Sequence, residues 1–113
     1  MWHIEVYTEP SGRQPVAEWL DGLEIDISAN LNDKIVRLQQ NGLMMLNTKM
    51  MKPIRGYVSG FYELIYSKYR VAVYHEVATN TFILLHGFKK ERMRETRGIE
   101  TAYSRLREYL KRR

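Results

Sequence analysis

Residues 69–96 read YRVAVYHEVATNTFILLHGFKKERMRET. Two runs rich in β-branched and aromatic residues, 69–77 and 81–88, are separated by only three residues, which predicts an antiparallel hairpin. The second run leads directly into a cluster of cations, so the end of this hairpin is expected to concentrate positive charge. The stretch therefore predicts a rigid sheet edge suited to binding a polyanion.

Strand signals also lie before this hairpin. Residues 61–66 are apolar and aromatic, and the two-residue connection Ser67-Lys68 is short enough for a second hairpin. Residues 3–7 alternate in the manner of a short first strand. Residues 43–60 show no clear period, so no element is predicted there.

Helical periodicity fills most of the remaining sequence. Pro15 suits the first position of a helix, and apolar residues recur at helical spacing from 16 to 23. A second helix has its apolar side over 27–38 and is expected to stop at Asn41-Gly42. A last helix carries its apolar stripe over 99–110. The order β-α-α-β-β-β-α predicts an α+β fold: a small antiparallel sheet with the first strand at one edge, two N-terminal helices on one face, and a C-terminal helix.

The composition limits the class of protein. A chain of 113 residues without cysteine is expected to form a single domain, residues 1–113, without disulfides or thiolate metal sites. No apolar run is long enough to span a membrane and no signal peptide precedes the first strand, so a cytoplasmic location is expected. Residues 1–43 carry three Lys/Arg against seven Asp/Glu, a net of −4, and residues 44–113 carry fifteen against six, a net of +9. This asymmetry favours a nucleic-acid partner, and a merely solvated basic helix is the alternative.

Several motifs in this order resemble the RelE/ParE superfamily of bacterial toxins, in particular its phage-derived, Gp49-like and HigB-type branch. The matching segments are PVAEWL at 15–20, KPIRG at 52–56, FYEL at 61–64, YRVAVY at 69–74 and LLHGFKK at 84–90. The resemblance implies a RelE-like fold and a toxin of a type II toxin–antitoxin system. Two positions depart from the pattern: Ile65 stands where the branch usually has arginine, and Arg97 where proline is common.

The resemblance implies an endoribonuclease that cleaves mRNA, in association with the ribosome. A metal-independent ribonuclease must remove the 2′-hydroxyl proton, stabilise charge on the phosphoryl oxygens and protonate the leaving oxygen. The scattered carboxylates and histidines show no ligand spacing, so neither a metal nor another cofactor is expected.

Three residues are candidates for catalysis. Arg70 is an arginine inside an apolar strand, and its planar fork matches phosphate oxygens; a solvent-facing residue on a half-exposed sheet is the alternative. Lys90 lies where relatives carry a basic residue after the last strand. His86 titrates near neutral pH, although period-2 alternation places it on one face with Phe82, Leu84 and Phe88, which favours a structural role.

Other residues are candidates for binding the nucleic acid. Phosphate contacts are expected from cations, and stacking on bases is expected from tyrosine rings, for which packing within the sheet is the alternative. The candidates are Arg55, Lys89, Arg92, Arg94, Tyr62 and Tyr74.

The expected partners are a cognate antitoxin, mRNA and the ribosome, with operon DNA reached only through the antitoxin and no membrane. Two alternatives stay open. One is a ParE-like toxin that inhibits gyrase without cleaving RNA, which the absence of arginine at position 65 allows. The other is a degenerate phage-derived protein that only binds nucleic acid or antitoxin.

Overall fold

The computed structural model describes residues 1–92 and 96–113. Its elements are β1 (His3–Val6), α1 (Pro15–Asp21), α2 (Ile25–Asn41), the 3-10 helix η1 (Gly42–Asn47), β2 (Met51–Pro53), β3 (Phe61–Tyr66), β4 (Tyr69–Glu76), β5 (Thr81–Lys89) and α3 (Arg97–Lys111). The predicted strands and helices are all present, and their order agrees with the prediction. None of the three helices is long and apolar enough to cross a membrane, within the part of the chain that is described.

The strands form one five-stranded sheet in the order β1-β5-β4-β3-β2. The hairpins β3–β4 and β4–β5 are antiparallel, as predicted, and the first strand lies at an edge. β1, however, pairs with β5 in parallel, with His3 opposite Thr81 and Val6 opposite Leu84. The prediction placed the first strand at an edge of the sheet without giving its direction, and the three-residue strand β2, paired with β3, was not predicted.

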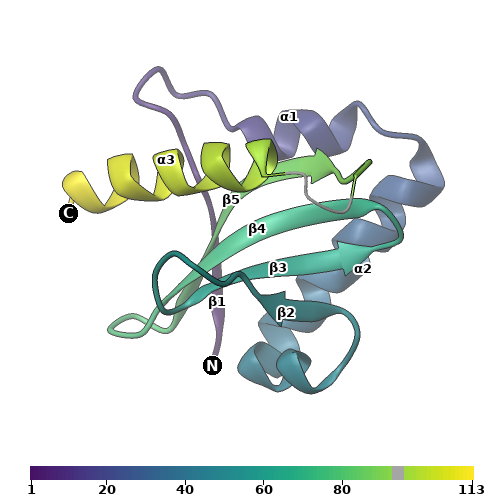
Figure 1. Ribbon diagram of the computed structural model, residues 1–113, viewed down its shortest axis with the longest axis horizontal. Helices are drawn as coiled ribbons and strands as arrows, with labels where there is room; N and C mark the ends of the chain where they lie inside the picture. Colours follow the sequence, from purple (N-terminus) through teal and green to yellow (C-terminus); the bar gives the residue numbers. More distant parts are fainter. Residues whose placement is uncertain (93–95) are drawn as a thin grey trace.

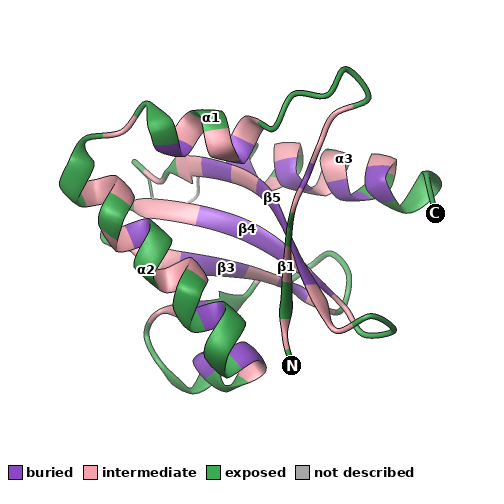
Figure 2. Cartoon of the chain, turned by 180° about the vertical axis from the view of Figure 1, so that it is seen from behind, coloured by how far each residue is buried: buried purple, intermediate pink, exposed green. Residues whose placement is uncertain are grey.

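The helices cover both faces of this sheet (Figures 1 and 2). α1 and α2 pack on one face, where Val16, Leu31 and Leu38 join Val71 and other apolar strand residues in a buried cluster. α3 packs on the opposite face and contributes a second buried cluster, with Ala102, Leu106 and Tyr109. The predicted placement of the first two helices on one face is confirmed.

A β-bulge in β5 changes which side chains face α3. Val73 pairs with Leu84, but Ala72 pairs with His86, so Leu85 is an additional residue without a direct partner in β4. Beyond such an extra residue, each side chain of the strand points to the face of the sheet opposite to the one that regular alternation would give.

The phase shift brings His86 onto the face of α3. His86 contacts Arg105 of α3, and Phe88 packs against the α3 cluster, whereas Phe82 and Leu84 lie in the cluster under α1 and α2. His86 therefore shares a face with Phe88 but not with Phe82 and Leu84, contrary to the expectation from uninterrupted alternation.

Glycines allow two close approaches of helices to this sheet. A Cβ at Gly87 would lie 2.0 Å from the ring of Trp19 in α1, and one at Gly98 would lie 2.5 Å from the ring of Phe88. Both distances are too short for a real Cβ contact. Gly98 thus lets the first turn of α3 rest directly on the end of β5, which sets the position of the candidate site.

Candidate nucleic-acid interface

A cavity of about 340 Å³ lies at the tip of the β3–β4 hairpin and is lined by Arg70, Lys90, Glu91 and Arg92. We call it the hairpin cavity. The backbone N–H of Lys90 donates a hydrogen bond of 2.7 Å to the carbonyl of Lys68, in the turn between β3 and β4. This bond brings the end of β5 beside the turn and places the cations around one opening.

Arg70 is held in place by three hydrogen bonds within the hairpin. Its Nε donates to Oε1 of Glu63 at 3.2 Å, and its Nη1 donates to the carbonyls of Ser67 and Tyr69 at 2.7 and 3.0 Å. The Glu63 side chain is only 8% exposed, and Lys52 Nζ lies 3.7 Å from the same carboxylate oxygen. The arginine therefore braces the turn and satisfies a buried acid.

This bonding limits what Arg70 can offer a ligand. Nε and Nη1 have intramolecular partners, whereas Nη2 has none among the described residues. Since the remaining donors are on one nitrogen, Arg70 presents a single-nitrogen contact to the cavity rather than the two-nitrogen fork that was expected. Within the described part of the chain, the side chains of Lys90 and Arg92 form no hydrogen bond or ion pair, and both line this cavity.

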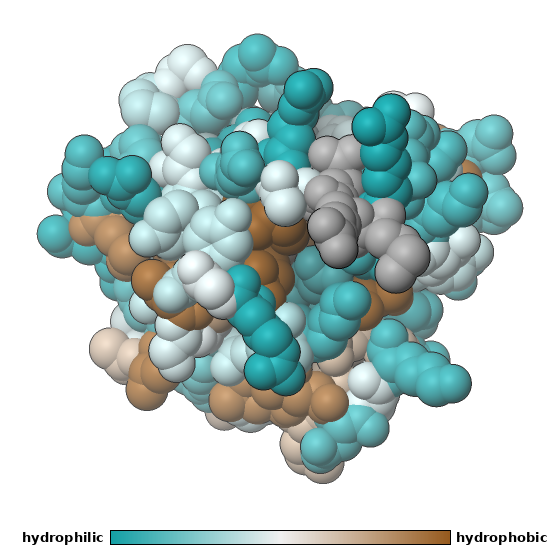
Figure 3. Space-filling view, viewed as in Figure 1, coloured by the Kyte–Doolittle hydropathy of each residue, from teal (hydrophilic) through white to brown (hydrophobic). Residues whose placement is uncertain are grey.

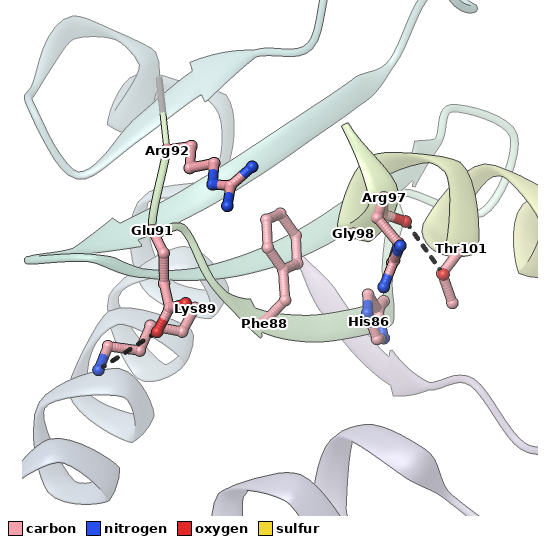
Figure 4. A pocket seen from close by; sticks show the side chains of 8 residues that line it. All are labelled: His86, Phe88, Lys89, Glu91, Arg92, Arg97, Gly98 and Thr101. Carbon is pink, nitrogen blue, oxygen red and sulfur yellow. Dashed lines mark hydrogen bonds and ion pairs between the residues drawn. The ribbon is translucent and has the colours of Figure 1, made fainter. Parts of the chain in front are cut away.

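A larger cavity of about 630 Å³ adjoins the hairpin cavity and shares Glu91 and Arg92 with it (Figure 4). We call it the ring cavity, because the rings of His86 and Phe88 line it, 5.6 Å apart and inclined by 17°. Figure 3 shows that hydrophobic patches lie among hydrophilic side chains on this face of the molecule. The lining residues are His86, Phe88, Lys89, Glu91, Arg92, Arg97, Gly98 and Thr101.

His86 is neutral in this environment. Nη1 of Arg105 donates to Nδ1 of His86 at 2.9 Å and also to the carbonyl of Leu85 at 3.0 Å. Burial, together with the charge of Arg105, lowers the pKa of His86 to about 4. Because Nδ1 accepts from a guanidinium, Nε2 carries the ring hydrogen. At neutral pH His86 can donate a hydrogen bond through Nε2, but it cannot act as an acid in the imidazolium form.

The predicted site residues fall into three groups. Arg70, Lys90 and Arg92 line the hairpin cavity, and His86, Lys89 and Arg92 line the ring cavity. In Figure 4 the Lys89 side chain points away from the rings toward Glu91, whose Oε1 lies 3.8 Å from its Nζ.

The remaining predicted residues do not line either cavity. Tyr62 packs against the cluster under α1 and α2, on the opposite face of the sheet from Arg70. Tyr74 is on the α3 face, but it lies four residues along β4 from Arg70, roughly 13 Å away at the rise of a strand. Arg55 is exposed in the connection between β2 and β3, and Arg94 lies outside the described residues.

The structure adds residues that the sequence analysis did not single out. Glu91 lines both cavities and is the one carboxylate that does so among the described residues. The sequence could have indicated Glu91, because it is an acidic residue within a run of cations. Arg105 was missed because its contact with His86 spans 19 residues and depends on the bulge in β5. Ile65, the position where the family arginine is absent, lies directly opposite Arg70.

No metal centre is formed by the described residues, because no three His, Asp or Glu side chains gather closely enough to hold an ion.

A solved structure shares this architecture. The mixed sheet, with two helices on one face and one on the other, is a RelE-like α+β fold. The crystal structure of the isolated RelE toxin of E. coli superposes on it with a TM-score of 0.60 at 15% identity, and the match covers 97% of this chain and 99% of that chain. The toxin–antitoxin complex RelBE2 of Mycobacterium tuberculosis gives a TM-score of 0.48 at 17% identity, covering 79% of this chain and 98% of that chain.

The model of the phage-derived Gp49-like family matches residues 18–107, and the chain belongs to that family. No curated protein sequence matches the chain significantly.

Proposed function

We propose that this protein is the toxin of a type II toxin–antitoxin system, that it cleaves mRNA on the ribosome as a metal-independent endoribonuclease, and that a cognate antitoxin neutralises it. The observation that carries the proposal is the hairpin cavity at the end of β5, which is lined by Arg70, Lys90 and Arg92 and adjoins the ring cavity. Membership of the Gp49-like family and the RelE-like fold support it.

The reaction proposed for the hairpin cavity is attack of a ribose 2′-oxygen on the adjacent phosphorus. The bond to the 5′-oxygen breaks and this oxygen takes a proton from solvent, which leaves a 2′,3′-cyclic phosphate and a 5′-hydroxyl. Lys90, Arg92 and Nη2 of Arg70 stabilise the negative charge that develops on the phosphoryl oxygens. In this proposal Glu91, the carboxylate that lines the cavity, accepts the 2′-hydroxyl proton.

The charge of the same surface supports the proposal of an antitoxin partner. Lys90 and Arg92 have no side-chain partner among the described residues, and a cleft of this kind binds RNA backbones with little discrimination. A partner that covers the two cavities would prevent this binding. An acidic or amphipathic segment matches the cations and the exposed apolar atoms around them.

The test is induction of the gene in a bacterium, with and without the neighbouring open reading frame, followed by mapping of transcript 5′ ends. We expect growth arrest and new 5′ ends within translated regions, both suppressed by co-expression of the neighbour. The double variant Lys90→Ala/Arg92→Ala should lose both effects, whereas Lys111→Ala, at the far end of α3, should keep them. Arrest without new 5′ ends would refute the ribonuclease proposal.

A second candidate function is supported by the bonding of two residues. Arg70 uses Nε and Nη1 inside the hairpin, and His86 is held neutral by Arg105. Arg70 therefore has few free donors for a phosphate, and His86 cannot act as a cationic acid. Both facts favour a toxin that acts by binding a protein, such as a gyrase inhibitor. Arrest that persists in Lys90→Ala/Arg92→Ala cells with intact transcripts would favour this candidate.

A further inference from the structure

The ring cavity has the features of a site for one unstacked nucleobase. His86 and Phe88 lie two residues apart on β5, and their stacked rings line the cavity as an aromatic surface. Gly98 lets the first turn of α3 pack directly against the Phe88 ring, at the border of the cavity. Unstacked bases of single-stranded RNA bind on aromatic surfaces of this kind. The volume of about 630 Å³ is in the range of pockets that hold small molecules.

The position of the ring cavity suits a base whose phosphate lies in the hairpin cavity. The two cavities share Glu91 and Arg92, so a nucleotide can span them without leaving the protein surface. Phosphate contacts then position the RNA, and contacts to the base edge provide discrimination.

Hydrogen-bond donors dominate the edge of the aromatic surface. Nε2–H of His86 has no partner within the described part of the chain. In Figure 4 the side chain of Arg92 extends toward the Phe88 ring. The acceptor side chains there, Glu91 and Thr101, already have partners. Glu91 forms an ion pair with Lys89 at 3.8 Å, and the Thr101 hydroxyl donates to the Arg97 carbonyl at 3.1 Å.

The four bases differ in the groups that such a lining can bind. Guanine presents the O6 acceptor and uracil the O4 acceptor, whereas adenine and cytosine carry amino donors at these positions; N7 is an acceptor in both purines and does not separate them. A donor that faces an amino group remains unpaired, which costs binding free energy. A donor-lined site therefore distinguishes keto bases from amino bases.

We propose that the ring cavity is a nucleobase subsite that selects keto bases, guanine and uracil, over adenine and cytosine, with His86 as the residue that reads the keto oxygen. This inference rests on the proposed function for its choice of RNA as ligand. It assigns His86 a role in specificity instead of the acid–base role expected from the sequence.

The test is titration of the purified full-length protein with the four nucleoside 5′-monophosphates, by calorimetry and by amide chemical-shift perturbation. GMP and UMP should bind on the order of tenfold more tightly than AMP and CMP. The largest shifts should occur at His86, Phe88 and Thr101.

Two variants of His86 separate reading of the base from folding. His86→Phe keeps the ring surface but removes the Nε2 donor, so all four nucleotides should bind with similar affinity. His86→Gln can accept from Arg105 and still donate from its amide, so it should keep a preference for GMP and UMP. Lys111→Ala is the matched control and should behave as the wild type.

The proposal is overturned by equal affinity for the four nucleotides, by the absence of saturable binding, or by a keto preference that persists in a folded His86→Phe protein. Its failure is distinguishable from failure of the proposed function. Keto-selective binding without RNA cleavage would leave the subsite standing and refute the ribonuclease. RNA cleavage by a protein that binds the four nucleotides equally would support the ribonuclease and refute the keto-selective subsite.

Discussion

Arg70 connects the stability of the β3–β4 hairpin with the chemistry of the hairpin cavity. Its replacement by alanine removes the hydrogen bonds to Glu63, Ser67 and Tyr69 and leaves the mostly buried Glu63 carboxylate with Lys52 as its one cationic neighbour among the described residues. We expect the free energy of unfolding to fall by about 1–3 kcal/mol. We also expect single-turnover RNA cleavage to slow about a hundredfold or more, because a preorganised positive charge is lost.

Denaturant unfolding and single-turnover kinetics measure the two effects separately. Arg37→Ala is the matched control, because Arg37 forms an exposed ion pair with Asp33 at 2.8 Å, and its loss should change stability by less than about 1 kcal/mol. Unimpaired cleavage by a folded Arg70→Ala protein would remove this residue from the proposed mechanism.

His86 should make stability depend on pH in a defined window. Its folded-state pKa of about 4 lies below the unfolded value of 6.5, since burial disfavours the charged ring. The unfolded state therefore binds the proton first, and the free energy of unfolding decreases as the pH falls from 6.5 to about 4. The imidazole has partial access to solvent, so we expect a contribution of about 1–2 kcal/mol.

The measurement is chemical unfolding of the wild type and His86→Gln at intervals between pH 4 and pH 7. Carboxylates titrate in both proteins, so the difference between the two curves isolates the histidine. The wild type should lose more stability than the variant as the pH falls. Parallel curves would show that His86 is not protected from protonation in the folded state.

At the level of elements, the contact between β5 and α1 depends on a glycine, Gly87, which has no side chain. A Cβ at Gly87 would lie 2.0 Å from Cε3 of Trp19. We expect Gly87→Ala to lower the free energy of unfolding by about 1–3 kcal/mol, because α1 or its tryptophan must move away from the sheet. Thermal unfolding monitored by tryptophan fluorescence measures the loss.

Gly22 provides the control for this substitution. It is an α-helical C-cap residue with ordinary dihedral angles, and a Cβ there would lie 3.6 Å from its nearest neighbour. Gly22→Ala should therefore be neutral or slightly stabilising. Equal effects at the two glycines would contradict the packing described for Trp19.

The elements with strong periodicity were predictable from the sequence. β3, β4 and β5 begin at the predicted residues Phe61, Tyr69 and Thr81, because turn signals bound them closely. α2 ends at Asn41, as the following Gly42 indicated, with φ of 55° at that glycine. The parallel pairing of β1 was not predictable, because its partner is about 80 residues away and strand alternation carries no information on direction.

The cations of the candidate site were predictable from the sequence, but the hydrogen bonds and orientations of its side chains were not. Lys90 and Arg92 line the hairpin cavity, as expected for cations that follow a strand. The pairing of Arg70 with Glu63 depends on strand register, and the orientation of His86 depends on the bulge at Leu85. Both are tertiary features that a one-dimensional pattern does not encode.

At the level of the whole molecule, the charge asymmetry should appear in the salt dependence of RNA binding. Lys90→Ala and Arg92→Ala should each weaken binding to all single-stranded RNA sequences and reduce the slope of log K against log salt concentration by roughly 0.7. Fluorescence anisotropy at several salt concentrations measures both quantities. Lys111→Ala should change the slope less, and a uniform effect of all three variants would argue against a localised RNA site.

The most direct test of the central claim is end-group analysis of mRNA cut on translating ribosomes by the purified protein. Transesterification at the hairpin cavity predicts fragments with 5′-hydroxyl and 2′,3′-cyclic phosphate ends, produced by the wild type and lost in Lys90→Ala/Arg92→Ala. Fragments with 5′-phosphate ends, or intact mRNA at protein concentrations that saturate the ribosomes, would contradict the account.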